Sequence, residues 1–310
     1  MTNVFIDGSA GTAGLRIRDR LLARADLSLI ELPRELRKDP AARKEAINSA
    51  DIAFLCLPDA AAVESVSLVE RERVIVIDTS TAHRTAPGWD YGFPELHGQR
   101  AAIAASRRVA NPGCHASGFI VLIEPLVRAG LLRQDAALTC FSVTGYPGGG
   151  KQMIAEYEAE PRPARYAAPR QYGLPQRHKH LKEMTAISGL TTEPAFCPIV
   201  ADYYSGMAVT VPVFARDLRG TADDVRAVYR ARYHSRIVHY TDAADDDSLL
   251  AANALTGRDD MEVLVAGNDE RILLISRFDN LGKGAAGAAI QNLNILLGVE
   301  ETTGLELPIG

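Results

Sequence analysis

No run of apolar residues in this 310-residue sequence reaches the roughly 20 needed to span a bilayer, and the net charge at neutral pH is only −5. Apolar residues make up 47% of the chain and charged residues 24%. Such a composition excludes an intrinsically disordered chain and indicates no surface for nucleic acid or for an anionic membrane. There are also no repeats. We therefore expect a globular protein whose partners are small molecules.

Cysteines are few and far apart: Cys56, Cys114, Cys140 and Cys197. They form no C-x-x-C pair, and the opening residues MTNVFIDG do not resemble a secretory leader. A disulfide framework is therefore not expected, and we predict a cytoplasmic location. Cys56, Cys140 and Cys197 lie in or beside apolar runs, which is typical of small buried side chains.

The length predicts about two domains. The first third alternates helical patterns with short apolar runs, at 4–6, 27–32, 52–57 and 74–77, as in a parallel sheet covered on both faces. Longer alternating runs follow at 137–143, 207–214, 262–265 and 271–277. We predict an α/β protein: a doubly wound Rossmann-type nucleotide domain plus an α+β catalytic domain with a mainly antiparallel sheet. The interval 160–176 is expected to be an irregular loop, and 282–297 a long helix.

A glycine-rich segment, IDGSAGTAG, follows the first expected strand and opens the first expected helix. Backbone N–H groups and the positive end of a helix dipole can hold a pyrophosphate at such a turn. The spacing of Gly8, Gly11 and Gly14 is G-x-x-G-x-x-G rather than the commoner G-x-G-x-x-G, so a tight turn without a ligand stays open as the alternative. We favour dinucleotide binding.

The end of the second expected strand carries residues that suit either form of the cofactor. Glu31 could pair with a ribose hydroxyl, as in NAD sites, whereas Arg34, Arg37 and Lys38 could accept the 2′-phosphate of NADP. A solvated basic turn is the alternative. We favour NADP.

Cys114 follows Asn-Pro-Gly and precedes a run with apolar residues at helical spacing. This pattern places the thiol at or near a helix N-terminus, where the dipole and the first N–H groups favour the reactive thiolate. The same N–H groups could stabilise an oxyanion. Cys114 is therefore the predicted nucleophile. Its neighbour His115 is a poor base for it, because adjacent helical residues do not face each other.

His178 and His180 are two residues apart in YGLPQRHKHLKEM. Both imidazoles share a face if this segment is extended, and they diverge if it starts a helix. A group with a pKa near 6.5 suits proton exchange with a thiol at neutral pH. No Cys or His lies nearby at zinc-finger spacing, so we expect no metal.

Four motifs occur in order: the glycine segment, NPGC at 111–114, GYPGGGKQMI from Gly145 and HKHLKEM from His178. With IDTSTAHR, YGFPEL, YYSGMAVTVPV and DNLGKGAAGAAIQNLNILLG they cover nearly the whole chain. In this set the sequence resembles the short type of N-acetyl-γ-glutamyl-phosphate reductase, a family related to the aspartate-semialdehyde dehydrogenases. The resemblance implies an NADP-binding domain over 1–114 and 281–310, and a catalytic, substrate-binding and dimerisation domain over 115–280.

The resemblance also implies an activity: NADPH-dependent reduction of N-acetyl-γ-glutamyl phosphate to the 5-semialdehyde with release of phosphate, in arginine biosynthesis. Cys114 would hold the substrate as a thioester, with His180 as the acid/base and His178 as the second choice. The implied cofactor contacts are Gly8, Ser9, Gly11, Thr12, Ala13, Gly14, Arg34, Cys56, Leu57, Pro58, Ser80, Asn280 and Gly282. The implied substrate contacts are Arg84, Asn111, Gly148, Lys151 and His178. A homodimer or homotetramer is expected.

The sequence departs from the family after the cysteine, where His115 stands in place of the usual aromatic residue. Ala116 and Ser117, which follow, also differ from the usual family pattern. We expect little effect on the chemistry. The alternatives are an aspartate-semialdehyde dehydrogenase, a lysine-pathway relative, or a nucleotide sensor without catalysis. A sensor needs neither Cys114 nor the HKH segment, so their joint presence argues against it.

Overall fold

The computed structural model describes residues 1–242, 244–246 and 248–308. The chain forms two compact units. The first comprises Met1–Pro94, Gly98–Pro112 and Ala285–Leu305, and the second comprises Glu95–His97, Gly113–Gly284 and the residues from Glu306 onward. Each unit contains one sheet.

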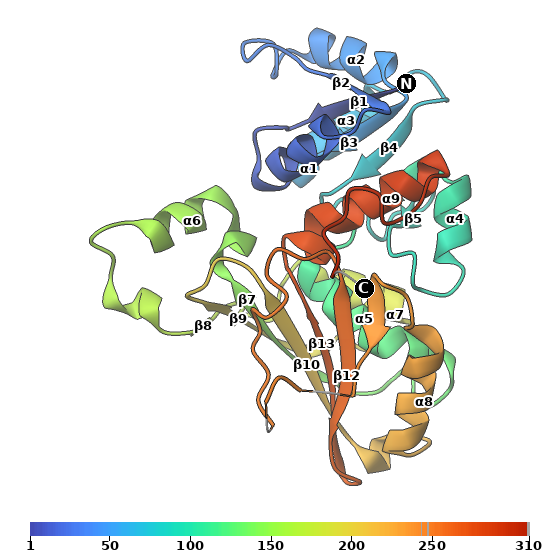
Figure 1. The fold of residues 1–310 in the computed structure, drawn as a ribbon, viewed down its shortest axis with the longest axis vertical. Helices are drawn as coiled ribbons and strands as arrows, with labels where there is room; N and C mark the ends of the chain where they lie inside the picture. The colour runs from blue at the N-terminus through green and yellow to red at the C-terminus, as the bar shows by residue number, and fades with distance from the viewer. Residues whose placement is uncertain (243, 247, 309–310) are drawn as a thin grey trace. The chain divides into compact units, whose positions relative to one another are not determined.

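The sheet of the first unit has six strands in the order β2-β1-β3-β4-β6-β5, and every neighbouring pair is parallel (Figure 1). The strands are β1 (Thr2–Asp7), β2 (Leu27–Ile30), β3 (Ile52–Leu55), β4 (Ile75–Asp78), β5 (Asp90–Tyr91) and β6 (Arg108–Ala110). The helices are α1 (Thr12–Leu22), α2 (Pro40–Ser49), α3 (Asp59–Ser67), α4 (Gln99–Ala105) and α9 (Gly287–Leu297). The predicted doubly wound fold is confirmed.

Helices cover both faces of this sheet, which explains why its strands are continuous apolar runs. Val4 and Ile6 of β1 pack in one core with α1 and α9, whereas Phe5 packs in the opposite core with α2. The strand order reverses at β1, whose neighbours are β2 and β3. In open parallel sheets ligands bind at such a switch point, beyond the carboxyl ends of the strands. The glycine segment begins there.

The sheet of the second unit has seven strands in the order β11-β12-β13-β10-β7-β9-β8. They are β7 (Thr139–Gly145), β8 (Arg170–Gln171), β9 (Ala195–Ala201), β10 (Met207–Phe214), β11 (Val238–Tyr240), β12 (Met261–Gly267) and β13 (Arg271–Phe278). The sheet is mixed: β11–β12 and β7–β9 are parallel pairs, while the other four neighbouring pairs are antiparallel.

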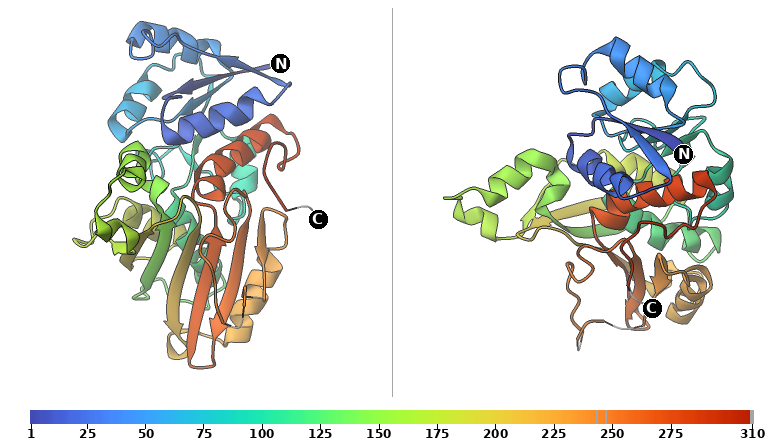
Figure 2. Two further views of the ribbon diagram at one scale, coloured as in Figure 1. Left: turned by 60° about the vertical axis from the view of Figure 1, so that its left-hand side comes forward. Right: turned by 45° about the horizontal axis from the view of Figure 1, so that its top comes forward.

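One face of this sheet is packed by helices, seen beside the strands in Figure 2. They are α5 (Cys114–Arg128) and α8 (Ala222–Arg232), while α7 (His180–Ser188) packs against α5. Helix α5 lies against β10 and β13, and α8 lies against β12. Gly118 allows this approach, because a Cβ there would lie 2.4 Å from Val209 Cγ2. Ser276 of β13 donates to the Gly118 carbonyl at 2.9 Å, which fixes α5 on the sheet.

Two segments differ from their predicted form. Within the interval 160–176, expected to be irregular, the chain forms a 3₁₀ turn (Ala164–Ala167) and the short strand β8, while α6 (Gly150–Glu158) precedes it. Tyr157 and Tyr166 form a small core there with Val200. The long helix expected over 282–297 begins with a π-helical turn, Gly282–Ala286, before α9. In the part of the chain that the structure describes, every helix is too short or too polar to span a bilayer.

Candidate active site

The glycine segment closes tightly against the end of β3. Gly8 has φ +87°, and a Cβ there would lie 2.3 Å from the Cys56 carbonyl oxygen. A Cβ on Gly14 would lie 2.5 Å from the Gly8 carbonyl oxygen. Gly11 is the N-cap of α1, and its N–H donates to Gly8 O at 3.0 Å. Both Gly8 and Gly14 are required by close backbone approach, which leaves the start of α1 open to a ligand.

A cavity of about 610 Å³ lies beside this loop in the first unit. Four of the predicted cofactor contacts line it, namely Gly8, Ser9, Arg34 and Leu57. Thr12 begins α1, Pro58 is the N-cap of α3, and the Cys56 carbonyl occupies the space that a side chain on Gly8 would need. The loop and the cavity therefore bring these predicted residues together in one place.

Ser80 is engaged differently from the loop residues. Its hydroxyl donates to Asp78 Oδ2 at 2.6 Å, and the same oxygen contacts His83 Nδ1 at 2.6 Å. The His83 ring stacks on Trp89 with centroids 4.1 Å apart. The Ser80 hydroxyl thus belongs to a buried polar cluster at the end of β4.

Cys114 is the first residue of α5, as predicted from the sequence, and it is half-buried. A helix leaves its first N–H groups without intrahelical acceptors. The N–H of the N-cap residue Gly113 donates to Glu183 Oε1 at 2.8 Å. Glu183 lies one turn after His180, the first residue of α7. Residues three apart share a helix face, so the Gly113–Glu183 hydrogen bond joins the starts of the helices that carry Cys114 and His180.

The raised thiol pKa values of Cys56 and Cys140 distinguish these two cysteines from a nucleophile. Burial raises the pKa of the Cys56 thiol to about 12 and also raises the pKa of Cys140. Both therefore stay protonated near neutral pH. Cys197 lies half-buried on β9.

The two histidines of the HKH segment lie together although a helix begins at His180. Their ring centroids are 4.8 Å apart. His178 belongs to a turn before α7, and its Nδ1 accepts the His180 N–H at 3.2 Å. The turn provides a third arrangement, different from the extended strand and the helix considered from the sequence. Burial, followed by the charge of Lys179, lowers the pKa of His178, which keeps its ring neutral at pH 7.

His115 lies at the centre of a ring cluster that the sequence did not predict. Its ring centroid is 5.8 Å from that of His178, 5.6 Å from His180 and 5.3 Å from Phe196. Its Nδ1 contacts Ser142 Oγ at 2.6 Å, and its Nε2 contacts Tyr172 OH at 2.7 Å. Burial lowers the His115 pKa to about 3, so the ring is neutral. These hydrogen bonds and ring contacts join His115 to the cluster.

Arg84 and Asn111, predicted to contact substrate, are buried in the first unit. Arg84 donates to the carbonyl oxygens of Asn111 at 2.9 Å and Thr79 at 3.0 Å. Asn111 Nδ2 donates to the Ala285 carbonyl, and its Oδ1 accepts from Asn292 Nδ2, each at 3.1 Å. These contacts brace the chain just before Cys114.

Gly148, Asn280 and Gly282 lie in the second unit, where Gly148 and Asn280 meet. A Cβ on Gly148 would lie 3.6 Å from Asn280 Nδ2. Asn280 Oδ1 accepts the Gly206 N–H at 2.9 Å, whereas its buried Nδ2 has no hydrogen-bond partner within the described residues. The Asn280 amide is therefore a donor that a ligand could use. Glycine is required at position 282, because a Cβ there would lie 2.1 Å from the Arg258 carbonyl oxygen. Lys151 is exposed on α6.

No cluster of three or more His, Cys, Asp or Glu side chains that could hold a metal ion occurs in 1–242, 244–246 and 248–308.

Comparison with known proteins agrees with this architecture. The family model described as "Semialdehyde dehydrogenase, NAD binding domain" matches residues 3–105, and "Semialdehyde dehydrogenase, dimerisation domain" matches 114–280. Among solved structures, aspartate semialdehyde dehydrogenase II from Vibrio cholerae has a TM-score of 0.71 at 18% identity, over 96% of this chain and 98% of its own. The enzyme from Francisella tularensis gives 0.71 at 13% identity, over 96% and 100%. The fold and the matched domains define the semialdehyde dehydrogenase class.

The curated relatives identify the family within this class. N-acetyl-gamma-glutamyl-phosphate reductase 2 of Pseudomonas putida is 46% identical over 97% of this chain and 98% of its own length. The Nostoc protein with the same name is 42% identical over 97% and 98%. The chain belongs to the N-acetyl-γ-glutamyl-phosphate reductase family, as the sequence motifs indicated.

Proposed function

We propose that this protein reduces N-acetyl-γ-glutamyl phosphate to N-acetylglutamate 5-semialdehyde, with release of phosphate, through a thioester on Cys114. The observation that carries the proposal is the hydrogen bond from the Gly113 N–H to Glu183 at 2.8 Å. It fixes the start of α5, where Cys114 lies, to the helix that begins with His180. The family relationship supports the same chemistry, and the step belongs to arginine biosynthesis.

Cys114 attacks the carbonyl carbon of the acyl phosphate as a thiolate. The bond from carbon to sulfur forms, the bond from carbon to the phosphate oxygen breaks, and phosphate leaves. His180 accepts the thiol proton beforehand and returns a proton to the departing phosphate. The first N–H groups of α5 stabilise the negative charge that develops on the carbonyl oxygen. The acyl group then stays on Cys114 as a thioester.

The glycine segment and its cavity fit a dinucleotide, since two of the three glycines admit no side chain and the cavity lies at the switch point of the sheet. Gly8, Ser9 and Gly11 would bind the pyrophosphate, with Arg34 at the adenosine ribose. When bound, NADPH supplies the hydride that reduces the acyl group on Cys114 to the aldehyde. Asn280 Nδ2 is a buried donor that could orient either the dinucleotide or the acyl phosphate.

Mass spectrometry tests this function without the cofactor. Protein mixed with N-acetyl-γ-glutamyl phosphate should gain one acyl group on Cys114, and later addition of NADPH should release the semialdehyde and restore the free protein. Cys114→Ala should gain nothing, while Cys197→Ala should react as the natural chain does. Aspartyl phosphate serves as the competing substrate. Equal acylation by both, or a natural chain that is never acylated, contradicts the proposal.

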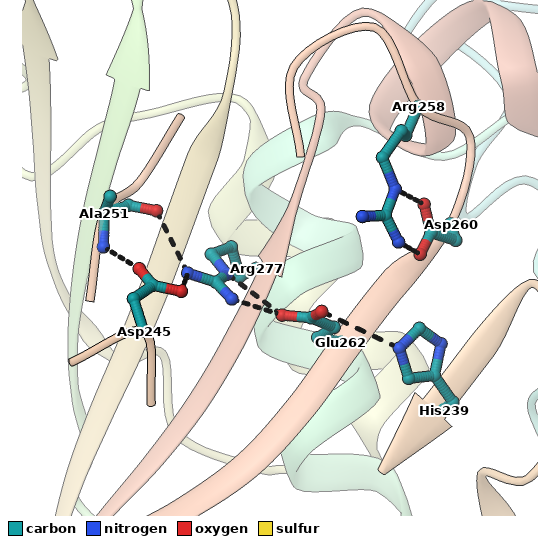
Figure 3. A network of polar contacts seen from close by, with 7 residues as sticks. All are labelled: His239, Asp245, Ala251, Arg258, Asp260, Glu262 and Arg277. Atoms are coloured by element: carbon teal, nitrogen blue, oxygen red, sulfur yellow. Dashed lines mark hydrogen bonds and ion pairs between the residues drawn. The ribbon is translucent and has the colours of Figure 1, made fainter. Parts of the chain in front are cut away.

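The outer face of the second sheet suits a second copy of the chain. Phe141 of β7, Phe214 of β10 and Leu273 of β13 are 43%, 48% and 36% exposed, on the face opposite α5 and α8. At one side of this face the buried Arg277 lies between Glu262 and Asp245 (Figure 3). Exposed apolar surface of this kind marks an interaction site. We therefore propose a homodimer, or a tetramer made of such dimers, in the cytoplasm.

Size-exclusion chromatography coupled to light scattering, which measures the mass of the eluting protein, tests this assembly. Leu273→Asp should shift the mass toward that of one chain. The matched control is Leu174→Asp, because Leu174 is 69% exposed on the interval before α7 and lies outside the sheet. A natural chain that elutes as a monomer contradicts the proposed assembly.

A further inference from the structure

Glu31, the residue whose carboxylate favours NAD, forms an ion pair in the structure. It directly follows β2, and its Oε1 accepts a hydrogen bond from Arg18 Nε at 2.7 Å. Arg18 lies on α1, the helix that the glycine segment opens. The hydrogen bond from Arg18 lowers the pKa of Glu31, and the charges of Arg18 and Arg37 lower it further, so the carboxylate is ionised. The acid at the end of β2 is therefore present with its charge neutralised by a residue from another element.

The cavity around this pair has an excess of positive charge. Its lining includes five basic side chains and three acidic ones: Arg18, Arg34, Arg37, Lys38 and Arg43 against Asp7, Glu31 and Glu35. Arg43 is bound to Asp7, with Arg43 NH2 3.0 Å from Asp7 Oδ2. The Arg37 Nε donates to the Leu32 carbonyl at 3.2 Å, which holds the basic turn near Glu31.

An unpaired carboxylate at this position would accept hydrogen bonds from a ribose diol and repel a 2′-phosphate. An arginine on that carboxylate removes the repulsion, and its planar guanidinium can also bind a phosphate through two parallel hydrogen bonds. We propose that Arg18 determines the preference of this site for NADPH over NADH: it neutralises Glu31 and donates to the 2′-phosphate. The inference rests on the proposed dinucleotide site and adds to it the residue that selects between the two cofactors.

Direct binding tests this role without turnover. The fluorescence of the reduced nicotinamide is titrated with purified protein, and Kd is measured for NADPH and for NADH. Arg18→Met keeps the aliphatic part of the side chain but removes the charge. We expect its Kd for NADPH to rise about tenfold or more, because a charge-assisted phosphate contact is lost, while the Kd for NADH stays within about threefold. Glu31→Gln should weaken the binding of NADH and leave NADPH bound as tightly as in the natural chain or more tightly.

Arg16→Met is the matched control, because Arg16 lies on the same helix but outside the lining of the cavity. It removes the same charge, and the ratio of the two Kd values should not change. If the natural chain prefers NADPH and Arg18→Met keeps the same ratio of the two Kd values, the inference is overturned. The proposed function is then left intact. A natural chain that binds both equally also overturns the inference. One that binds neither overturns the proposed function itself.

Discussion

The Tyr233 hydroxyl donates to the Val121 carbonyl at 2.6 Å, from the C-cap of α8 to the middle of α5. The reason lies four residues further along α5, at Pro125, which has no N–H to bond this carbonyl. Tyr229, one turn before Tyr233, donates to the adjacent Leu122 carbonyl at 2.5 Å. The helix that begins with Cys114 is therefore completed by side chains of another helix.

Tyr233→Phe should lower the free energy of unfolding by about 1–3 kcal/mol, since it leaves a buried carbonyl without a donor and changes the packing little. Urea unfolding followed by far-ultraviolet circular dichroism measures this. Tyr240→Phe is the control, because Tyr240 donates to the exposed Asp242 and its loss should cost less than about 0.5 kcal/mol. Equal costs for the two variants would contradict the role of Pro125.

Iodoacetamide should alkylate Cys114 much faster than Cys56 or Cys140 at pH 8. Cys114 lies at a helix start, where a thiolate is stabilised. Burial raises the pKa of the other two, so they remain protonated thiols at that pH. Peptide mapping after brief labelling identifies the modified residue, and prior addition of acyl phosphate should protect it. Labelling of Cys56 or Cys140 before Cys114 would be evidence against Cys114 as the nucleophile.

Glu183 is the positioning residue that the sequence did not single out. Glu183→Ala should reduce kcat by about a hundredfold, because the N-cap N–H of α5 loses its acceptor and the two helix starts are no longer joined. Glu183→Gln keeps an acceptor oxygen and should recover most of kcat. The rate of Cys114 alkylation should follow the same order. If the Gln variant is as slow as the Ala variant in both measurements, the hydrogen bond is not what matters.

The fold could be predicted because its signals are local. Strands such as 4–6 are continuous apolar runs because Val4 and Phe5 enter opposite cores, and Gly8 and Gly14 mark close backbone approaches. The start of α5 at Cys114 could be predicted for the same reason. The ring cluster could not, because His115 meets Ser142 and Tyr172 across 27 and 57 residues of chain. The pairing of Glu31 with Arg18 likewise depends on the packing of α1 against β2.

The pH dependence of kcat/KM can distinguish His178 from His180 as the acid/base. Lys179 contributes to the lowered pKa of His178, because a nearby positive charge disfavours the imidazolium. Lys179→Met should therefore raise the pKa of His178. If His178 is the base, the acid limb of the profile moves to higher pH. Our choice, His180, predicts that the acid limb stays in place, because the charge of Lys179 acts on the pKa of His178. Lys182→Met, which removes an exposed charge from α7, is the control.

Arg277 should make the stability of the second unit depend on acid pH. Its NH1 lies 2.5 Å from Asp245 and its NH2 2.6 Å from Glu262, while its own side chain is 5% exposed (Figure 3). The hydrogen bond from Arg277 lowers the pKa of Asp245. Burial alone would raise the pKa of Glu262, but hydrogen bonds from His239 and Arg277 lower it overall. Carboxyl groups of lowered pKa add stability above their unfolded pKa, about 4, and lose it as pH falls through the folded value.

Arg277→Met should therefore lower the free energy of unfolding by about 2–4 kcal/mol at pH 7, since two carboxylates lose a partly buried partner. This difference from the natural chain should shrink as pH falls from about 5 to 3. Urea unfolding across this range measures it. Arg271→Met is the control on the same strand, because its pair with Glu270 is exposed and should be worth less than about 1 kcal/mol. A cost that stays constant down to pH 3 would mean that Arg277 acts through packing of its aliphatic part, since only the ion pairs respond to protonation of Asp245 and Glu262.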